Sequence, residues 1–226
     1  MKEIIPAILP KNFRELEKSL EIVHGAVSSV QIDVTDGKFA GVESWPLSKE
    51  DENFLEILRQ ERGMPFWEDF DFEIDLMVRD PLSCVDDWIQ AGATRIVFHI
   101  ETLDLDKDAL LLDQLKTEGL IQVGFAINID TPNEILKEYF QYADFIQVMG
   151  IAKIGFQGEG FNNECLQKIV WIKENLPNMI VSVDGGMNDE TIQQVFDVGA
   201  DRAVVGSYIL KSTNPRETIA ELQSLI

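Results

Sequence analysis

Three aspartates stand late in short β-branched runs, where a folded α/β protein could use them for chemistry. They are Asp33, Asp75 and Asp184. Side chains alternate along a strand, so in the run 30–34 the apolar residues can face helices while Gln31 and Asp33 point the other way. Carboxyl groups that converge in a sheltered pocket must share a cation or keep a proton on at least one of them. The sequence therefore predicts a cluster suited to proton transfer.

Glycine-rich segments accompany these acids and indicate an anion site. They are the segment 155–160, the pair Gly185-Gly186 directly after Asp184, and the pair Gly206-Ser207. Glycine lets an anion approach backbone N–H groups closely, because no Cβ stands in the way. Ordinary turns also need glycine, but three such loops favour phosphate. The predicted phosphate-loop residues are Gly155, Gly158, Gly185, Gly186, Gly206 and Ser207.

Eight strand-then-helix units position these residues. The predicted strands are 3–9, 29–34, 72–78, 94–100, 121–128, 145–149, 179–184 and 202–206. The predicted helices are 12–23, 51–62, 82–91, 107–117, 133–139, 163–175, 189–198 and 215–225. This alternation favours a closed parallel barrel, which places its reactive groups at the carboxyl ends of the strands. An open doubly wound sheet lacks support, because no glycine-rich dinucleotide turn follows the first strand. We expect one (β/α)₈ barrel domain spanning residues 1–226.

Helix boundaries and one irregular segment complete the predicted fold. Asp189 precedes an apolar-periodic run as an N-cap, and Gly199 and Gly92 follow helices as terminators. The segment 39–71 contains Trp45, Phe66 and Trp67. We expect it to cover the barrel by packing, with a lid or a subunit contact as the alternative.

The charge balance excludes several classes of partner. A formal net charge of -21 disfavours nucleic acid and anionic membranes, since both are bound mainly through Lys and Arg. The same field repels phosphate at long range, so a phosphate site must rely on local backbone dipoles. The first residues lack an export signal, and Cys84 and Cys165 are expected to be free thiols. We expect a cytoplasmic protein.

Several motifs in order along the chain are similar to those of one known family. They are residues 6–9, 33–37, 75–78, 97–101, 183–186 and 206–207. With them the chain resembles the ribulose-phosphate 3-epimerase family over nearly its whole length. The resemblance implies a metal-assisted 1,1-proton transfer next to a ketose carbonyl, with Asp33 and Asp184 as the two acids. It implies that Met77 and Met149 flank the reacting group and that the glycine loops hold phosphate.

The chain departs from the family pattern at the metal site. Gln31 and Asp75 stand where the family has histidines, Ala7 replaces a serine, and Thr35 replaces a methionine. The loop that includes Gly155 carries an extra residue before it. The implied metal site of Gln31, Asp33, Asp75 and Asp184 offers oxygen ligands only, which suit Mg²⁺ or Mn²⁺ better than Zn²⁺ or Fe²⁺. A site without metal is the alternative.

Three functions are compatible with these residues. The first is an epimerase or isomerase of a small phosphorylated sugar that uses Asp33 and Asp184, and the second is a sugar-phosphate-binding protein without turnover. Altered lyase or decarboxylase chemistry is a third, which a lysine among the inner strand ends would favour, and the sequence places none there. His99 either supports the barrel by hydrogen bonding or shuttles protons. The family resemblance also implies a homo-oligomer.

Overall fold

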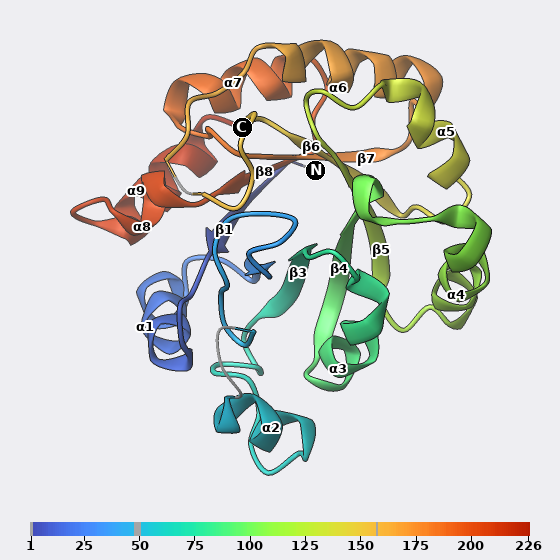
Figure 1. Cartoon of the computed structure of the whole chain (residues 1–226). Helices are drawn as coiled ribbons and strands as arrows, with labels where there is room; N and C mark the ends of the chain where they lie inside the picture. Colours follow the sequence, from blue (N-terminus) through green and yellow to red (C-terminus); the bar gives the residue numbers. More distant parts are fainter. Residues whose placement is uncertain (1, 48–50, 157) are drawn as a thin grey trace.

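The strands form a closed parallel barrel. The computed structural model describes residues 2–47, 51–156 and 158–226, and the eight strands pair in chain order from β1 round to β8 and back to β1 (Figure 1). The strands are β1 (Glu3–Ile8), β2 (Ser29–Thr35), β3 (Asp71–Met77), β4 (Ala93–His99), β5 (Gln122–Ile127), β6 (Phe145–Met149), β7 (Ile180–Asp184) and β8 (Arg202–Val205). The predicted (β/α)₈ barrel is confirmed, and no strand end lies more than one residue from its predicted position.

Helices form the outer layer around this ring (Figure 1). They are α1 (Phe13–Val23), α2 (Glu52–Leu58), α3 (Val85–Gln90), α4 (Leu105–Glu118), α5 (Leu136–Tyr139), α6 (Glu164–Asn175), α7 (Asp189–Asp197), α8 (Ser207–Leu210) and α9 (Pro215–Ser224). Short 3₁₀ turns η1 (Pro81–Cys84), η2 (Ile100–Thr102) and η3 (Asn133–Ile135) precede α3, α4 and α5. Among the described residues, no helix is long and apolar enough to cross a bilayer.

Most helix boundaries lie one to three residues from the predicted positions, and the end of α2 differs by four residues. The N-cap of α7 is Asn188 and not Asp189, because the Asn188 side chain accepts from the backbone N–H groups of Glu190 and Thr191. Thr191 Oγ1 accepts in return from the Asn188 N–H at 2.9 Å, which completes a capping box. Helix α2 ends at Leu58 rather than residue 62. Gly199 and Gly92 follow α7 and α3 as predicted.

The two faces of the barrel wall have different surroundings. On β2, Val30, Ile32 and Val34 belong to the large apolar core between strands and helices, whereas Gln31 and Asp33 are buried inside the ring. Smaller apolar groups fill the interior between the polar side chains: Ile5, Ala7 and Val204 in one, and Val97, Ala126, Phe145 and Met149 in the other. The predicted inward and outward alternation is therefore confirmed on β2.

A buried ionic cluster closes the amino-terminal end of the barrel. Glu73 is fully buried, and its Oε2 lies 2.7 Å from Nε of Arg95 and 3.7 Å from a terminal nitrogen of Arg202. Burial raises the pKa of Glu73, while the two guanidinium groups counteract that rise. Since Glu73 lies two residues before Asp75 on β3, this cluster forms the floor beneath the acids.

The segment 39–71 covers one side of the barrel, although its residues 48–50 lie outside the described part. Trp45 is fully buried and contacts Phe13, Phe54 and Trp88 with ring centroids 5.3–5.8 Å apart. Trp67, in contrast, is 62% exposed. The expected packing role holds for Trp45.

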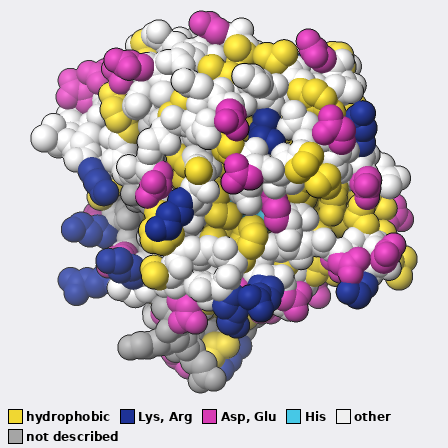
Figure 2. All heavy atoms as spheres, turned by 45° about the horizontal axis from the view of Figure 1, so that its top comes forward, with side chains coloured by type: hydrophobic (Ala, Val, Ile, Leu, Met, Phe, Trp, Pro, Cys, Tyr) yellow, Lys and Arg dark blue, Asp and Glu magenta, His cyan; other side chains and the backbone are white. Residues whose placement is uncertain are grey.

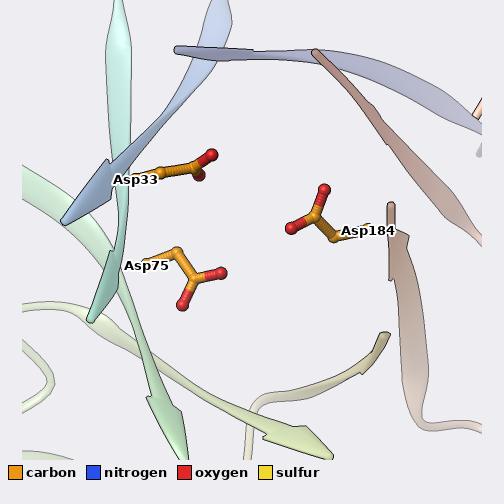
Figure 3. Close-up of side chains that lie close together, drawn as sticks. All are labelled: Asp33, Asp75 and Asp184. Carbon is orange, nitrogen blue, oxygen red and sulfur yellow. The ribbon is translucent and has the colours of Figure 1, made fainter. Parts of the chain in front are cut away.

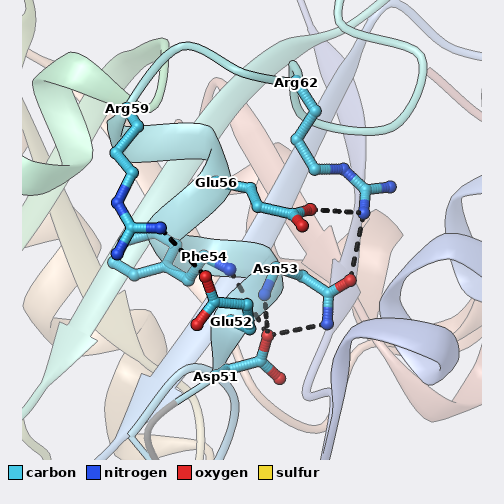
Figure 4. Close-up of polar contacts among 7 residues, drawn as sticks. All are labelled: Asp51, Glu52, Asn53, Phe54, Glu56, Arg59 and Arg62. Carbon is cyan, nitrogen blue, oxygen red and sulfur yellow. Dashed lines mark hydrogen bonds and ion pairs between the residues drawn. The ribbon is translucent and has the colours of Figure 1, made fainter.

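Polar contacts define the start of α2 within this segment (Figure 4). Asp51 Oδ1 accepts from the N–H groups of Asn53 and Phe54 at 2.9 and 3.3 Å, which caps the helix. Arg59 pairs with Glu52 at 2.9 Å across the helix surface. These polar contacts lie on the exposed side of the helix, whereas Phe54 packs against Trp45 and Trp88 on its inner side.

The surface carries many acidic groups. Figure 2 shows Asp and Glu side chains spread over one face and interspersed with Lys and Arg, in line with the formal net charge of -21. Cys84 and Cys165 are free, as predicted.

Candidate active site

Three aspartates converge inside the carboxyl end of the barrel (Figure 3). Asp33 on β2 and Asp75 on β3 are register partners, and Asp184 faces them from the end of β7. Each offers a carboxylate oxygen, and the three oxygens all lie within 4.8 Å of one another. Asp33 is 6% exposed, Asp75 0% and Asp184 9%. The structure thus brings together the acids that the sequence singled out.

Burial and mutual repulsion keep protons on this cluster. Burial raises the pKa of Asp33 well above its usual range, and the charges of Asp184 and Asp75 add to the rise. Burial followed by the charge of Asp75 raises the pKa of Asp184 to about 7. An acid with such a pKa can donate a proton near neutral pH while a partner accepts one. The pair is therefore suited to acid–base exchange.

Asp75 is held from behind by two side chains. His99 Nε2 lies 3.1 Å from Asp75 Oδ1, and Gln147 Nε2 donates to Asp75 Oδ2 at 2.9 Å. Asp33 is held by Gln31, whose Nε2 donates to Asp33 Oδ1 at 2.8 Å. These contacts fix the direction of the carboxylates, as outer residues commonly do around a reactive site.

His99 supports the cluster as a buried cation. Burial disfavours its charged form, but the negative charge of Asp75 and their hydrogen bond outweigh this and raise the pKa of His99 to about 9. Its Nδ1 lies 3.8 Å from Glu101 Oε2, and the ring of Phe39 meets it edge-on at a centroid distance of 5.2 Å. The sequence left two roles open for His99, support of the barrel by hydrogen bonding and proton shuttling, and the structure shows the hydrogen bond.

A pocket of about 270 Å³ opens above the acids at the carboxyl end of the barrel. The predicted catalytic acids, methionines and phosphate-loop residues all line it: Asp33, Asp184, Met77, Met149, Gly155, Gly158, Gly185, Gly186, Gly206 and Ser207. Asp75 and Gln31, both 0% exposed, lie beneath this wall instead. A ligand in the pocket would contact Asp33 and Asp184 directly, with Asp75 behind them.

Loops approach one another closely around the pocket. Gly186 has φ +70°, and a Cβ there would lie 2.6 Å from the Phe161 Cα. Gly41, in the loop after β2, meets Gly155 across the barrel mouth, where a Cβ on Gly155 would lie 2.6 Å from the Gly41 nitrogen. That loop is closed at its base, since Ser44 Oγ accepts from the Thr35 N–H at 2.9 Å. The loops after β2 and β6 therefore touch backbone to backbone.

The acid cluster fits a hard divalent cation. Oxygens that bind one such cation at 2.0–2.6 Å lie at most about 5 Å apart, and the three carboxylate oxygens meet this limit. Gln31 Oε1 is buried and has no hydrogen-bond partner among the described residues, so it is a further oxygen donor. A donor set without nitrogen or sulfur suits Mg²⁺, Mn²⁺ or Ca²⁺.

Sequence reasoning missed several residues of this site. Gln147 could have been found, because it precedes Met149 by two positions on β6 and so shares its inward face. Lys211 also lines the pocket and lies one helical turn after Ser207. Glu159 and Asn188 line it from loops, and no regular spacing marks them in the sequence. Gln157 lies outside the described residues.

Comparison with known proteins places these features in context. The model of the "Ribulose-phosphate 3 epimerase family" matches residues 3–210 of the chain. The chain is 31% identical over 216 residues to the ribulose-phosphate 3-epimerase of Treponema pallidum (strain Nichols), covering 93% of the chain and 92% of that protein. It is 26% identical over 226 residues to the ribulose-phosphate 3-epimerase of Schizosaccharomyces pombe, covering 99% and 93%.

Solved structures share the fold at lower sequence identity. KGPDC from Streptococcus mutans superposes with a TM-score of 0.70 and 12% identity, over 100% of the chain and 97% of that structure. The 3-hexulose-6-phosphate synthase from Salmonella typhimurium gives a TM-score of 0.69 and 12% identity, over 99% and 97%.

Proposed function

The chain belongs to the ribulose-phosphate 3-epimerase family, and from this premise we propose that it epimerises a small ketose phosphate by proton transfer between Asp33 and Asp184. The observation that carries the proposal is that these two acids line one pocket and both have a raised pKa. A pair of buried acids that share a proton can act as acid and base in one turnover.

The proposed reaction removes a proton from one face of a single carbon and adds a proton to the opposite face of the same carbon. The carboxylate of one aspartate takes the proton from the carbon next to the ketose carbonyl, so the C–H bond breaks and an enediolate forms. The carboxylic acid of the other aspartate gives its proton to the opposite face of that carbon. After one turnover the aspartate that began as the base holds the proton and the other aspartate is a carboxylate. The reverse reaction returns the two acids to their starting states. Met77 and Met149 line the same pocket and would exclude water from the reacting carbon.

The proposal includes a divalent cation held by Asp33, Asp75 and Asp184, with Gln31 as a further oxygen donor. When bound, such a cation would offset part of the negative charge of the acids and polarise a carbonyl group. His99 and Gln147 would orient Asp75 toward it through the hydrogen bonds already described. We expect Mg²⁺ or Mn²⁺ rather than Zn²⁺.

Glycine loops support a phosphorylated substrate. Gly155, Gly158, Gly185, Gly186 and the pair Gly206-Ser207 line one part of the pocket wall. Backbone N–H groups in such loops can bind phosphate oxygens without a side chain between them. We therefore propose a sugar phosphate whose reacting carbon lies between the two acids while its phosphate contacts these loops.

Solvent-exchange NMR tests the proposed function. D-Ribulose 5-phosphate is incubated with the protein in D₂O containing Mn²⁺ or Mg²⁺, and deuterium incorporation and epimer formation are followed. We expect both in the native protein and no epimer with either Asp33→Asn or Asp184→Asn, since each removes one side of the transfer. One of the two variants retains the acid that faces the substrate proton. That variant should still exchange this proton for deuterium, but without forming the epimer. Absence of exchange with every pentulose and hexulose phosphate tried would refute the proposal.

A sugar-phosphate-binding protein without turnover is the second candidate. The observation that favours it is that Gln31 and Asp75 occupy positions where the family resemblance implies histidines. It predicts thermal stabilisation by D-ribulose 5-phosphate with no deuterium uptake, and unchanged stabilisation in Asp33→Asn. Loss of that stabilisation in Asp33→Asn would count against it.

The family resemblance also leads us to propose a homo-oligomer in the cytoplasm. Sedimentation of the purified protein tests the oligomeric state, and a monomer at micromolar concentration would contradict it.

A further inference from the structure

The wall of the pocket is strongly asymmetric in charge. Among the described residues that line it, Asp33, Asp184 and Glu159 are acids and Lys211 is the single basic residue. The chain as a whole carries a formal net charge of -21. A phosphate dianion that enters this pocket therefore meets repulsion from the protein at long range and one cation at contact distance.

Lys211 lies at the end of the pocket that the glycine loops form. Its N–H donates to the carbonyl oxygen of Ser207 at 3.0 Å, so it follows Ser207 by one helical turn, on the same face. Gly158 is adjacent, because a Cβ on Gly158 would lie 3.8 Å from Ser207 Oγ. Lys211, Ser207 and Gly158 therefore border the same part of the wall.

The ammonium group of Lys211 is free to bind a ligand. Within the described part of the chain, Lys211 Nζ forms no ion pair, whereas Lys116 and Lys173 are each paired with an aspartate. The side chain is exposed, so its charge is not already used within the fold. Lysine is a compact point charge on a flexible stem and binds phosphate in that manner.

We propose that Lys211 supplies the side-chain cation for the phosphate group of the ligand and thereby selects phosphorylated over uncharged sugars. The proposal rests on the proposed function for the presence of a sugar phosphate in this pocket. Backbone N–H groups of the glycine loops supply hydrogen bonds, and Lys211 supplies the charge that they lack. Glu159 lines the same pocket, and its negative charge repels the phosphate group and lowers the affinity of the protein for it.

Ligand binding measured by calorimetry tests this role without reference to turnover. The probes are D-ribulose 5-phosphate, inorganic phosphate and unphosphorylated D-ribulose. In Lys211→Met we expect the Kd of both phosphate-bearing probes to rise about tenfold or more, as befits the loss of one charge-assisted contact. Binding of D-ribulose should stay the same. Lys211→Arg should remain within about threefold of the native protein, because it retains the charge.

Two further variants separate contact from overall charge. Lys18→Met removes one positive charge from an exposed lysine on α1 that forms no ion pair in the described structure, and should leave all three Kd values unchanged. Glu159→Gln should tighten phosphate binding about threefold. Equal phosphate affinity in Lys211→Met and the native protein, or an equal loss for D-ribulose, would overturn the proposal. Phosphate binding that depends on Lys211 in a protein without proton exchange would uphold the proposal and refute the epimerase function.

Discussion

Replacement of Asp184 by asparagine tests whether the acid cluster holds a proton in the folded protein. The pKa of Asp184 rises from its ordinary 3.8 to about 7, chiefly through burial and then through the charge of Asp75. A difference of about three pKa units, at roughly 1.4 kcal/mol each, corresponds to about 4 kcal/mol of folding free energy. The asparagine side chain would have the same shape as the protonated acid but could not ionise.

The sign of the effect follows from where the proton is bound. Below pH 3.8 the Asp184 carboxyl is protonated in both the folded and the unfolded chain, so its pKa difference does not lower the stability of the native protein. Between pH 3.8 and 7 the unfolded chain releases the proton and the folded chain retains it, so the stability of the native protein falls as pH rises. Above pH 7 the loss is complete. Removal of Asp184 also lowers the pKa of Asp33, which acts in the same direction.

The assay is urea unfolding in EDTA at pH values from about 4.5 to about 8, followed by tryptophan fluorescence. We expect Asp184→Asn to gain stability over the native protein by about 4 kcal/mol at the upper pH, and by far less at the lower one. Asp113→Asn, on the exposed face of α4, is the matched control for the same chemical change. A difference between Asp184→Asn and the native protein that does not vary with pH would refute the reasoning.

Three further substitutions test the site and the segment that covers it. Asp75→Asn should weaken Mn²⁺ binding, measured by electron paramagnetic resonance, at least tenfold while the chain stays folded, and unchanged affinity would exclude Asp75 as a ligand. Gly41→Ala should lower the free energy of unfolding more than Gly92→Ala, which adds only left-handed backbone strain of about 1–2 kcal/mol. Gly41→Ala should also weaken binding of D-ribulose 5-phosphate. Equal losses of stability in the two variants would show that the contact between the loops is unimportant. Trp45→Ala should lower the free energy of unfolding by about 3–5 kcal/mol, because Trp45 is fully buried. Trp67→Ala, at an exposed position, should lower it by about 0.5 kcal/mol or less. Similar losses in the two variants would contradict the packing described for the segment 39–71.

Sequence alone predicts what depends on near neighbours in the chain. Alternation along β2 correctly placed Asp33 inside the barrel, because each residue in a strand fixes the direction of the next. The barrel was predicted from eight repeats of one local pattern, and the pairing of β1 with β8 closes it as that number of repeats indicates. The same logic, applied to β6, would have found Gln147.

Contacts between distant loops could not be predicted in this way. The edge-on contact of Phe39 with His99 depends on how far a loop after β2 reaches across the barrel, which no periodicity encodes. The α7 cap was misplaced by one residue, because Asn188 and Asp189 are both good capping residues and only the backbone geometry distinguishes them. The pocket charge also required coordinates, since Lys211 and Glu159 come from separate loops.

The backbone contact between Gly41 and Gly155 limits how this barrel can be altered. Each glycine occupies the space in which a side chain on the other would lie. Neither residue can be made smaller, so a substitution at one position has no compensating substitution at the other. Only a longer or redirected loop would restore the fit. An engineer who grafts a foreign loop after β6 onto this protein would therefore have to replace the loop after β2 with it, as a matched set.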